Sequence, residues 1–334
     1  MMFFKLLFIT LLCITLIFIG ATASFSEENL GNDMDLTNAF RLPDYIVPYH
    51  YKINITLLPF NRLKITNFTG TCHVYIRTHR STRIISLHAQ KPQIEINHAI
   101  LINQQSTEVV WIKGKEYIPQ YNTYNNESHI LNFHFIEEIP SGRYYLFMNY
   151  TGFLNDNNES IFKNSYVNRT GHTKWLYATH FQTIGARQIF PCWDEPDFKA
   201  TFNISIKHRK EYTVLSNMNY NTKIRITNTK EQWMHFNITP EISTYHVAFC
   251  LLRNKWFKLT ISVHYGLKPF DSSHIILWNK NTTQASFARR VINKIALYSD
   301  NLLKNIEKIS LIQHVLIPGL PYDAVQKWGI VFYR

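Results

Sequence analysis

The residues with the most distinctive chemistry lie in one stretch, between residues 179 and 202. The stretch reads Thr179-His180-Phe181-Gln182, then Ala186-Arg187, then Phe190-Pro191-Cys192-Trp193-Asp194-Glu195-Pro196, then Phe198-Lys199-Ala200-Thr201-Phe202. Asp-Glu-Pro is typical of a tight charged turn, and alternating apolar residues follow it. By residue chemistry alone, Asp194 and Glu195 are either solvated or paired with Arg187.

Other self-contained catalytic motifs are absent from the sequence. It contains no Gly-x-Ser-x-Gly elbow, phosphate loop or dinucleotide fingerprint, and no histidine is followed by glutamate, so a His-Glu-x-x-His zinc helix is missing. His73 with His79, and His129 with His134, have no third ligand nearby in the sequence, whereas a zinc site needs at least three protein ligands. We therefore expect ordinary imidazoles, no metal ligand, no catalytic residue and no cofactor in this chain.

The elements around these residues are predicted to be strands. Apolar and polar residues alternate over 51–57, 198–206, 234–238 and 259–265, a period typical of strands with one buried face. Turn clusters separate the strands, which predicts an antiparallel sandwich or saddle of about two hundred residues. The fold class is therefore mainly β.

A second pattern begins after Tyr265. An apolar stripe from Phe287 to Ile306 predicts a helix, with Thr282 or Thr283 as its N-cap. A β-like run over Ile309–Ile317 and a further run over Trp328–Tyr333 follow. This region looks like the start of an α+β domain, and we expect Ile309–Ile317 and Trp328–Phe332 to be exposed without their partners.

Composition favours an ordered protein that does not bind nucleic acid. Apolar residues make up 46% of the 334 residues and charged residues 17%, unlike a disordered chain. The formal charge of +12 is spread thinly, and its longest basic cluster is His208-Arg209-Lys210. We expect a solvated basic surface that attracts acidic partners or membranes weakly.

The N-terminus predicts the secretory pathway. Lys5 precedes an uncharged run from Leu6 to Ile19, and Ala21-Thr22-Ala23 fits a cleavage site, so residues 1–23 are interpreted as a signal peptide, with a membrane anchor as the alternative. Nine glycosylation sequons support an extracellular location or the outer face of the plasma membrane: Asn54, Asn67, Asn126, Asn149, Asn158, Asn168, Asn203, Asn237 and Asn281. After cleavage three cysteines remain, Cys72, Cys192 and Cys250, which allow at most one internal disulfide.

Taken as a string, the segment from Thr179 to Phe202 resembles the aminopeptidase N family of zinc metallopeptidases, the gluzincin aminopeptidases. Further matches in order are Arg41-Leu42-Pro43, Leu87-His88-Ala89, Leu215-Ser216-Asn217-Met218 and the terminal Pro318–Arg334. The resemblance implies a saddle-shaped β-domain that leads into a thermolysin-like catalytic domain, and an enzyme that uses one zinc ion to remove N-terminal residues from peptides. It also implies that Gln182 lines the pocket for the substrate's first residue.

The sequence departs from the family pattern where the peptide amine is bound. The family's Gly-Ala-Met-Glu-Asn motif aligns with Asp323-Ala324-Val325-Gln326-Lys327, so Gln326 replaces the carboxylate that holds the amine, and Lys327 is expected to put a cation near it. His180 stands where the family has a second glutamine, and Gly185 stands where the family usually has an aspartate. By resemblance, the substrate-binding residues are Gln182, Ala324 and Gln326.

These observations predict four segments and leave two functions open. The segments are the signal peptide (1–23), a leader (24–40), an aminopeptidase N-like β-domain (41–256) and an incomplete start of the peptidase domain (257–334). The zinc helix would lie beyond Arg334, so one hypothesis is that this chain is part of a zinc aminopeptidase. The chain would then be inactive alone, and a missing C-terminal region would associate the protein with a membrane. The other is a non-catalytic secreted glycoprotein that keeps the β-domain as a peptide- or protein-binding module. An unrelated adhesive sandwich would leave the Phe190–Pro196 string unexplained.

Overall fold

The structure is a computed structural model that describes residues 40–58, 66–104, 114–154, 160–167, 171, 173–225, 229–253, 257–263, 273–279, 287, 290–292, 294, 295 and 311–334. Its contacts divide the chain into Met1–Arg41 and Leu42–Arg334. The expected signal peptide and almost all of the leader lie outside the described residues.

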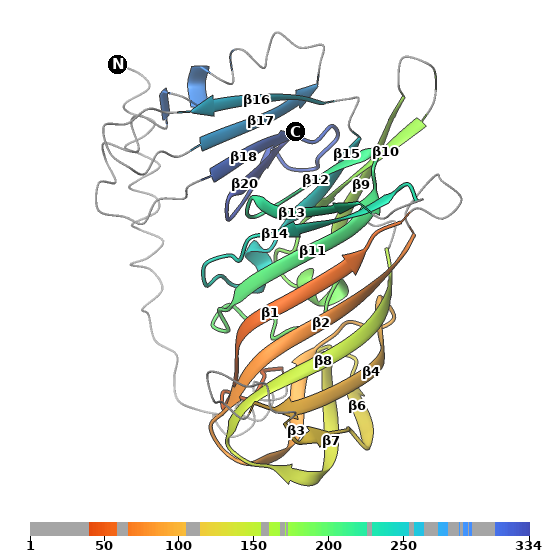
Figure 1. Ribbon diagram of the computed structural model, residues 1–334, viewed down its shortest axis with the longest axis vertical. Coiled ribbons are helices and arrows are strands. Elements are labelled where there is room, and N and C mark those ends of the chain that lie inside the picture. The colour runs from red at the N-terminus through yellow and green to blue at the C-terminus, as the bar shows by residue number, and fades with distance from the viewer. Residues whose placement is uncertain are drawn as a thin grey trace, which may run out of the picture. The chain divides into compact units, whose positions relative to one another are not determined.

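Eight strands form the largest sheet (Figure 1), in the order β13-β14-β11-β1-β2-β8-β4-β5. Their bounds are β1 Ile46–Thr56, β2 Asn67–Thr78, β4 Ile94–Asn103, β5 Glu116–Tyr117, β8 Gly142–Phe153, β11 Thr201–Arg209, β13 Tyr220–Arg225 and β14 Glu231–Phe236. β1 is antiparallel to β2 and parallel to β11. A parallel neighbour requires a long crossover, and here the crossover contains the whole chain from β2 to β10.

The predicted alternation gives this sheet one buried and one wet face. Tyr51, Ile53 and Ile55 of β1 are buried, whereas Lys52 is exposed and Asn54 half-buried. Tyr51 stacks on Phe202 of β11, with ring centroids 4.8 Å apart and planes within 7°. The prediction for residues 51–57 is confirmed. The strand expected from Phe198 begins instead at Thr201, because Phe198 and Lys199 take part in turn hydrogen bonds after Glu195.

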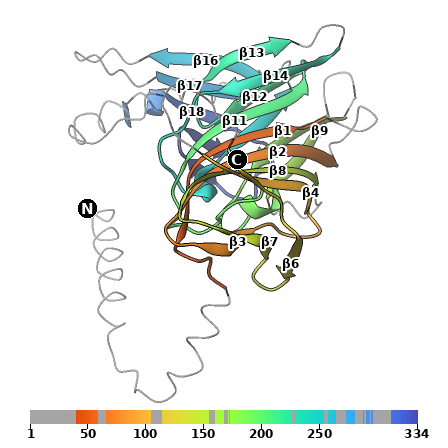
Figure 2. The same ribbon diagram turned by 60° about the horizontal axis from the view of Figure 1, so that its bottom comes forward.

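Two smaller sheets share the buried core. β3 (Thr82–His88), β7 (Ile130–Ile139) and β6 (Tyr121–Asn125) form one, and β12 (Tyr212–Ser216), β15 (Phe249–Arg253), β10 (Thr173–Thr179) and β9 (Ile161–Val167) form the other. Figure 2 shows β3, β7 and β6 as a separate layer beside β8 and β4. Ile85, Leu87 and Phe133 from that layer join Leu146 and Met148 of β8 in one hydrophobic core. The mainly β fold with antiparallel sheets is confirmed.

The last described strands belong to a separate five-stranded sheet. Its order is β16-β17-β18-β20-β19, with bounds Phe257–Val263, Ser273–Asn279, Leu311–Leu316, Ile330–Tyr333 and Ala324–Lys327. The β-like run predicted over Ile309–Ile317 is confirmed as a strand where it is described, at Leu311–Leu316, and the run over Trp328–Tyr333 contains the strand Ile330–Tyr333. Their predicted exposure is wrong: Val315, Ile317, Ile330 and Phe332 are at most 1% exposed. They pack in a second core with Leu176, Ala178 and Cys250 of β10 and β15, because the four-stranded sheet presents an apolar face to them.

The predicted helix over 287–306 falls mostly outside the described residues. Phe287, 290–292, 294 and 295 are helical, and the side chains of Phe287, Val291 and Ile295 are exposed. Cys72, Cys192 and Cys250 are buried and free, and no disulfide joins any two of them. No helix among the described residues is both long and apolar enough to span a membrane.

Candidate functional site

The Phe190–Pro196 string is buried as far as Asp194 and is held by the backbone of a distant strand. Cys192 and His88 exchange two backbone hydrogen bonds, of 2.8 and 3.0 Å. Trp193 is fully buried, and its backbone N–H donates to the Tyr51 hydroxyl at 3.1 Å. The most specific string in the sequence therefore ties β1 and β3 together and does not face solvent.

Arg187, three residues before this string, forms a buried ion pair with Asp194 inside it. Arg187 Nε lies 2.9 Å from Asp194 Oδ2, and the two side chains are 8% and 1% exposed. Arg187 also donates to the carbonyls of Ser128 and Asp194 at 3.1 Å each, and the Thr244 hydroxyl donates to Asp194 Oδ1 at 2.5 Å. A buried pair is tolerable only when its remaining hydrogen-bonding positions are filled, as they are here. Of the two alternatives for Asp194, the pairing with Arg187 is confirmed.

His88 completes the network in its neutral form. Its Nδ1 accepts the backbone N–H of Asp194 at 3.2 Å. Burial, with smaller contributions from the positive charge of Arg187 and from His129, lowers the pKa of His88 to about 2. Glu195, the other carboxylate of the string, accepts the backbone N–H of Leu42 at 2.7 Å. These groups are all used for structure, so the string offers no free acid or base.

Gln182 lies on a short turn after β10, next to an anchored phenylalanine. Phe181 is fully buried and meets Phe190 and Phe249 edge to face, at 6.0 and 6.4 Å between ring centroids. Gln182 itself is exposed. A Cβ on Gly185 would lie 2.9 Å from both the His180 carbonyl oxygen and the Phe181 Cα, so the aspartate expected by resemblance does not fit this turn unless the backbone shifts.

His180 connects the Gln182 segment to the loop before β19. Its ring lies 4.7 Å from that of Tyr322, measured between centroids, and its backbone N–H donates to the Ser160 carbonyl at 2.8 Å. Its Nδ1 is buried without a hydrogen-bond partner among the described residues. Burial, with a smaller contribution from Lys327, lowers the pKa of His180. The structure thus brings together two segments that lie about 140 residues apart in the sequence.

Strand β19 separates the aligned motif residues onto two faces. Ala324 and Gln326 are exposed, whereas Val325 and Lys327 are buried, as strand alternation requires. Lys327 is 2% exposed, and its ammonium donates to the Tyr245 carbonyl at 2.8 Å. Burial lowers the pKa of Lys327 to about 8. Lys327 is predicted to put a cation near the bound amine, but its ammonium lies on the buried face, opposite to Gln326, because adjacent strand residues point to opposite faces.

Asp323, which could have returned a negative charge to this face, is paired elsewhere. Its carboxylate forms an ion pair with the Arg334 guanidinium, and its carbonyl accepts the Arg334 backbone N–H at 3.1 Å. Both side chains are exposed, so this pair contributes about 1 kcal/mol or less. The exposed face of β19 then carries Ala324 and the neutral amide of Gln326.

Two polar side chains, those of Asn217 and Gln313, hold the five-stranded sheet against the β-domain. The Asn217 side chain donates to the carbonyls of His246 and Trp328 and accepts the Ala248 N–H, all at 2.8 Å. Gln313 donates from β18 to the Ser216 carbonyl at 2.5 Å. Asn217 belongs to the Leu215–Met218 string, but its partners come from distant segments, and no local pattern identifies Gln313 or Thr244.

The described residues do not fit a zinc ion. No group of three or more histidine, cysteine, aspartate or glutamate side chains in that part of the chain could hold a metal. His73 hydrogen-bonds the Tyr145 hydroxyl, and His134 Nε2 lies 2.8 Å from Thr123 Oγ1.

Six of the nine sequons lie among the described residues, between Asn54 and Asn237. Among them, Asn54 lies on β1, Asn149 on β8 and Asn203 on β11. Asn149 is exposed, and the other two are half-buried. Exposed positions are also occupied by Asn67, Asn126 and Asn237. Asn158, Asn168 and Asn281 lie outside the described residues.

Comparison with known proteins places this chain in a family. Residues 47–246 match the Peptidase M1 N-terminal domain, so the chain belongs to that family. It is similar to Aminopeptidase A of Gloydius brevicauda, 29% identical over 318 residues, which cover 94% of this chain and 31% of that protein. Glutamyl aminopeptidase of Bos taurus is 28% identical over 92% of this chain and 30% of its own length. Thyrotropin-releasing hormone-degrading ectoenzyme of Rattus norvegicus is 26% identical over 88% of this chain and 26% of its own length. The chain thus spans about a third or less of the length of these relatives.

Proposed function

We propose that this chain is the N-terminal part of a secreted or membrane-associated zinc metallo-aminopeptidase that removes N-terminal residues from peptides. The match to the M1 N-terminal domain and the names of the similar aminopeptidases support a peptide substrate. The domain division proposed is 41–256 and 257–334. Its support is the change at Phe257 from the β-domain sheets to the separate five-stranded sheet.

One observation carries the proposal: the segment aligned with the peptide-amine motif docks on the β-domain with its polar face outward. Lys327, Asn217 and Gln313 hold β18 to β20 against that domain. This docking leaves Ala324 and Gln326 exposed. Gln182 is exposed on the segment that contacts the loop before β19 through His180 and Tyr322. Neutral amides at these positions can donate to a peptide carbonyl or accept from an amine.

In this proposal the chain supplies a peptide-facing wall and does not hydrolyse peptides alone. A zinc ion, bound by another part of the protein, would activate the attacking water. Gln326 orients the peptide N-terminus by a neutral hydrogen bond. Such a bond contributes roughly 0.5–1.5 kcal/mol, against about 1.5–3 kcal/mol for a bond to a charged group.

The test measures peptide binding and turnover by the mature chain, residues 24–334. We expect a short peptide with a free amine to bind, and Gln182→Ala and Gln326→Ala each to weaken binding several-fold. Gln120→Ala, an exposed glutamine remote in sequence from the site, is the matched control and should change nothing. Turnover that a chelator abolishes would refute the inactivity. If the same peptide with an acetylated N-terminus binds equally well, and neither variant changes its binding, the non-catalytic binding module is favoured instead.

A further inference from the structure

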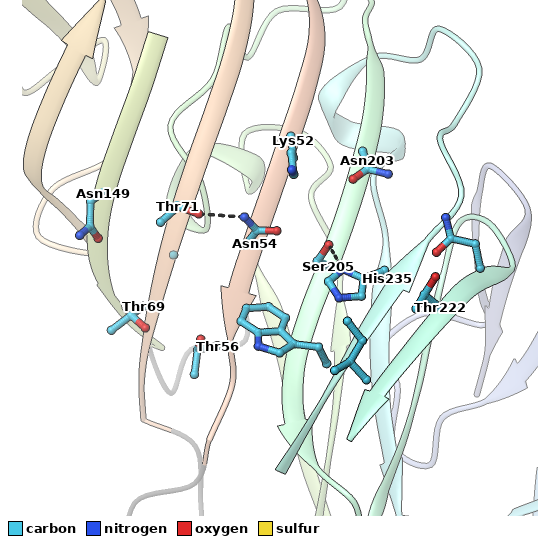
Figure 3. Close-up of a pocket in the computed structure, with 14 residues that line it drawn as sticks. Lys52, Asn54, Thr56, Thr69, Thr71, Asn149, Asn203, Ser205, Thr222 and His235 are labelled. Atoms are coloured by element: carbon cyan, nitrogen blue, oxygen red, sulfur yellow. Dashed lines mark hydrogen bonds between the residues drawn. The ribbon is translucent and has the colours of Figure 1, made fainter. Parts of the chain in front are cut away.

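The wet face of the eight-stranded sheet contains a hollow that the proposed peptide site does not use. Its volume is about 680 Å³, within the usual range of ligand pockets, about 300–1,000 Å³. Figure 3 shows Asn54, Thr71, Asn149 and Ser205 projecting on this face from four neighbouring strands. Lys52 is the one charged side chain among the described residues that line it. The hollow therefore suits a neutral, hydroxyl-rich ligand better than an ion.

A continuous row of polar residues forms the floor. Strand register aligns six residues directly opposite one another on β8, β2, β1, β11, β14 and β13: Asn149, Thr71, Asn54, Ser205, His235 and Thr222. Four strand spacings of about 4.8 Å separate Asn149 from His235, so the row is roughly 19 Å long between them. Ser205 Oγ lies 2.8 Å from His235 Nδ1, and burial lowers the pKa of His235, which favours its neutral form. The floor is a ladder of uncharged donors and acceptors.

Three of the six described sequons converge on this one hollow. Asn54, Asn149 and Asn203 all line it. A sequon on a strand places its Asn and its Ser or Thr on the same face, because side chains two residues apart point the same way. Thr56 and Ser205 accordingly also line the hollow.

The sheet holds the Asn54 amide in a geometry compatible with a sugar. Asn54 Nδ2 donates one hydrogen to Thr71 Oγ1 at 3.0 Å. An N-linked sugar replaces one of the two amide hydrogens, so one hydrogen remains for a bond to a neighbour such as Thr71. Asn54 is the sequon at the centre of the polar row, between Thr71 and Ser205.

An aromatic side chain completes the hollow beside that row. Trp233 and Ile224 lie opposite each other on β14 and β13, and both line it. Trp233 is half-buried and stacks on His235, with centroids 5.9 Å apart and planes within 16°. The C–H face of a pyranose packs well on an aromatic ring, while its hydroxyls need the donors and acceptors of the row. Polar floor and aromatic wall together match carbohydrate.

We propose that this hollow is a carbohydrate site occupied by the chain's own N-linked glycan, attached at Asn54, whose first sugars pack on Trp233. The inference rests on the proposed passage through the secretory pathway. The glycan fills the wet face between β1 and β14 and covers Trp233 and the exposed Ile224.

The test begins with glycan mapping of the full chain secreted from a eukaryotic cell. Enzymatic release in ¹⁸O-water marks each occupied asparagine for mass spectrometry. We expect Asn54 and the exposed Asn237 to be occupied. If no asparagine is occupied, the secretory proposal fails and this inference fails with it. If Asn237 is occupied while Asn54 is empty, the carbohydrate-site proposal is overturned and the secretory proposal stands. The same holds if Asn149 or Asn203 carries a sugar while Asn54 does not.

The second arm measures protection of Trp233 by oxidative footprinting. Thr56→Val removes the Asn54 sequon but keeps the Asn54–Thr71 bond, and we expect Trp233 oxidation to rise several-fold while Trp175 stays unchanged. Asn237→Gln, which removes a sequon that does not line the hollow, is the matched control and should leave Trp233 protected.

A third arm does not depend on how well Thr56→Val folds. An N-glycan-cleaving enzyme should release the native Asn54 glycan much more slowly than the Asn237 glycan, and Trp233→Ala should accelerate release at Asn54 alone. Equal Trp233 oxidation with and without the glycan, or equal release rates at the two asparagines, would overturn the packing.

Discussion

Replacing Asp194 by Asn should destabilise the β-domain more than any exposed ion-pair change. The substitution keeps the side chain's shape but leaves the Arg187 guanidinium, 8% exposed, without its counter-charge at 2.9 Å. It also weakens the 2.5 Å bond from Thr244. Breaking one side of a buried pair costs about 3–5 kcal/mol. A domain of ordinary stability has about 5–15 kcal/mol in total, so the loss is a large share.

Equilibrium unfolding in urea, followed by tryptophan fluorescence, measures this loss. We expect a lower midpoint with an unchanged slope, since the surface exposed on unfolding stays the same. Glu231→Gln is the control, because its pair with Lys207 is 2.8 Å long but partly exposed, and such pairs contribute about 1 kcal/mol or less. Arg187→Met completes a double-mutant cycle, and the coupling energy should exceed 1 kcal/mol by a clear margin.

The reasoning is refuted if Asp194→Asn loses no more stability than Glu231→Gln. A coupling energy near zero between Arg187 and Asp194 would also refute it, because the pair would then contribute nothing beyond its separate side chains. Either result would mean that the Phe190–Pro196 string is held by its backbone bonds and by Trp193 packing.

Three further perturbations test other parts of the argument. The pKa of His88 is about 2 in the folded state and 6.5 in the unfolded state, so only the unfolded state binds the proton as the pH falls from 6.5 to 5. This group should therefore lower the free energy of unfolding by roughly 1.5 kcal/mol over that range. A His88→Gln variant, measured by urea titration at both pH values, should lack that drop. Phe181→Ala should lower the free energy of unfolding by about 3–5 kcal/mol, because the ring is fully buried against Phe190 and Phe249. The thermal midpoint should fall, and an unchanged midpoint would show that Gln182 is positioned by other contacts. Gly152→Ala should cost about 1–3 kcal/mol, since a Cβ there would lie 2.1 Å from the Phe68 ring, and a variant as stable as wild type would contradict the tight packing of β2 on β8.

Much of the β-domain could be predicted from the sequence, because period-two alternation reports directly which face of a strand is buried. Tyr51, Ile53 and Ile55 follow it, and so do Asn54 and Asn203 on the wet face. The start of β11 was misplaced, since Phe198 fits the alternation but its backbone is used in the turn after Glu195. The family was identifiable for a similar reason: the Phe190–Pro196 string is short, contiguous and unusual.

The tertiary structure decided what that string does and where its partners lie. Thr244 and Ser128 approach Asp194 and Arg187 from segments 50 and 59 residues away, and no local pattern records such contacts. The structure also placed the Lys327 ammonium on the Tyr245 carbonyl, away from Gln326, and it buried the strands expected to be exposed because the four-stranded sheet covers them. Sequence determined the alternation, the sequons and the family; only the packing of distant strands decided which polar groups are locked in the core and which remain open to a ligand.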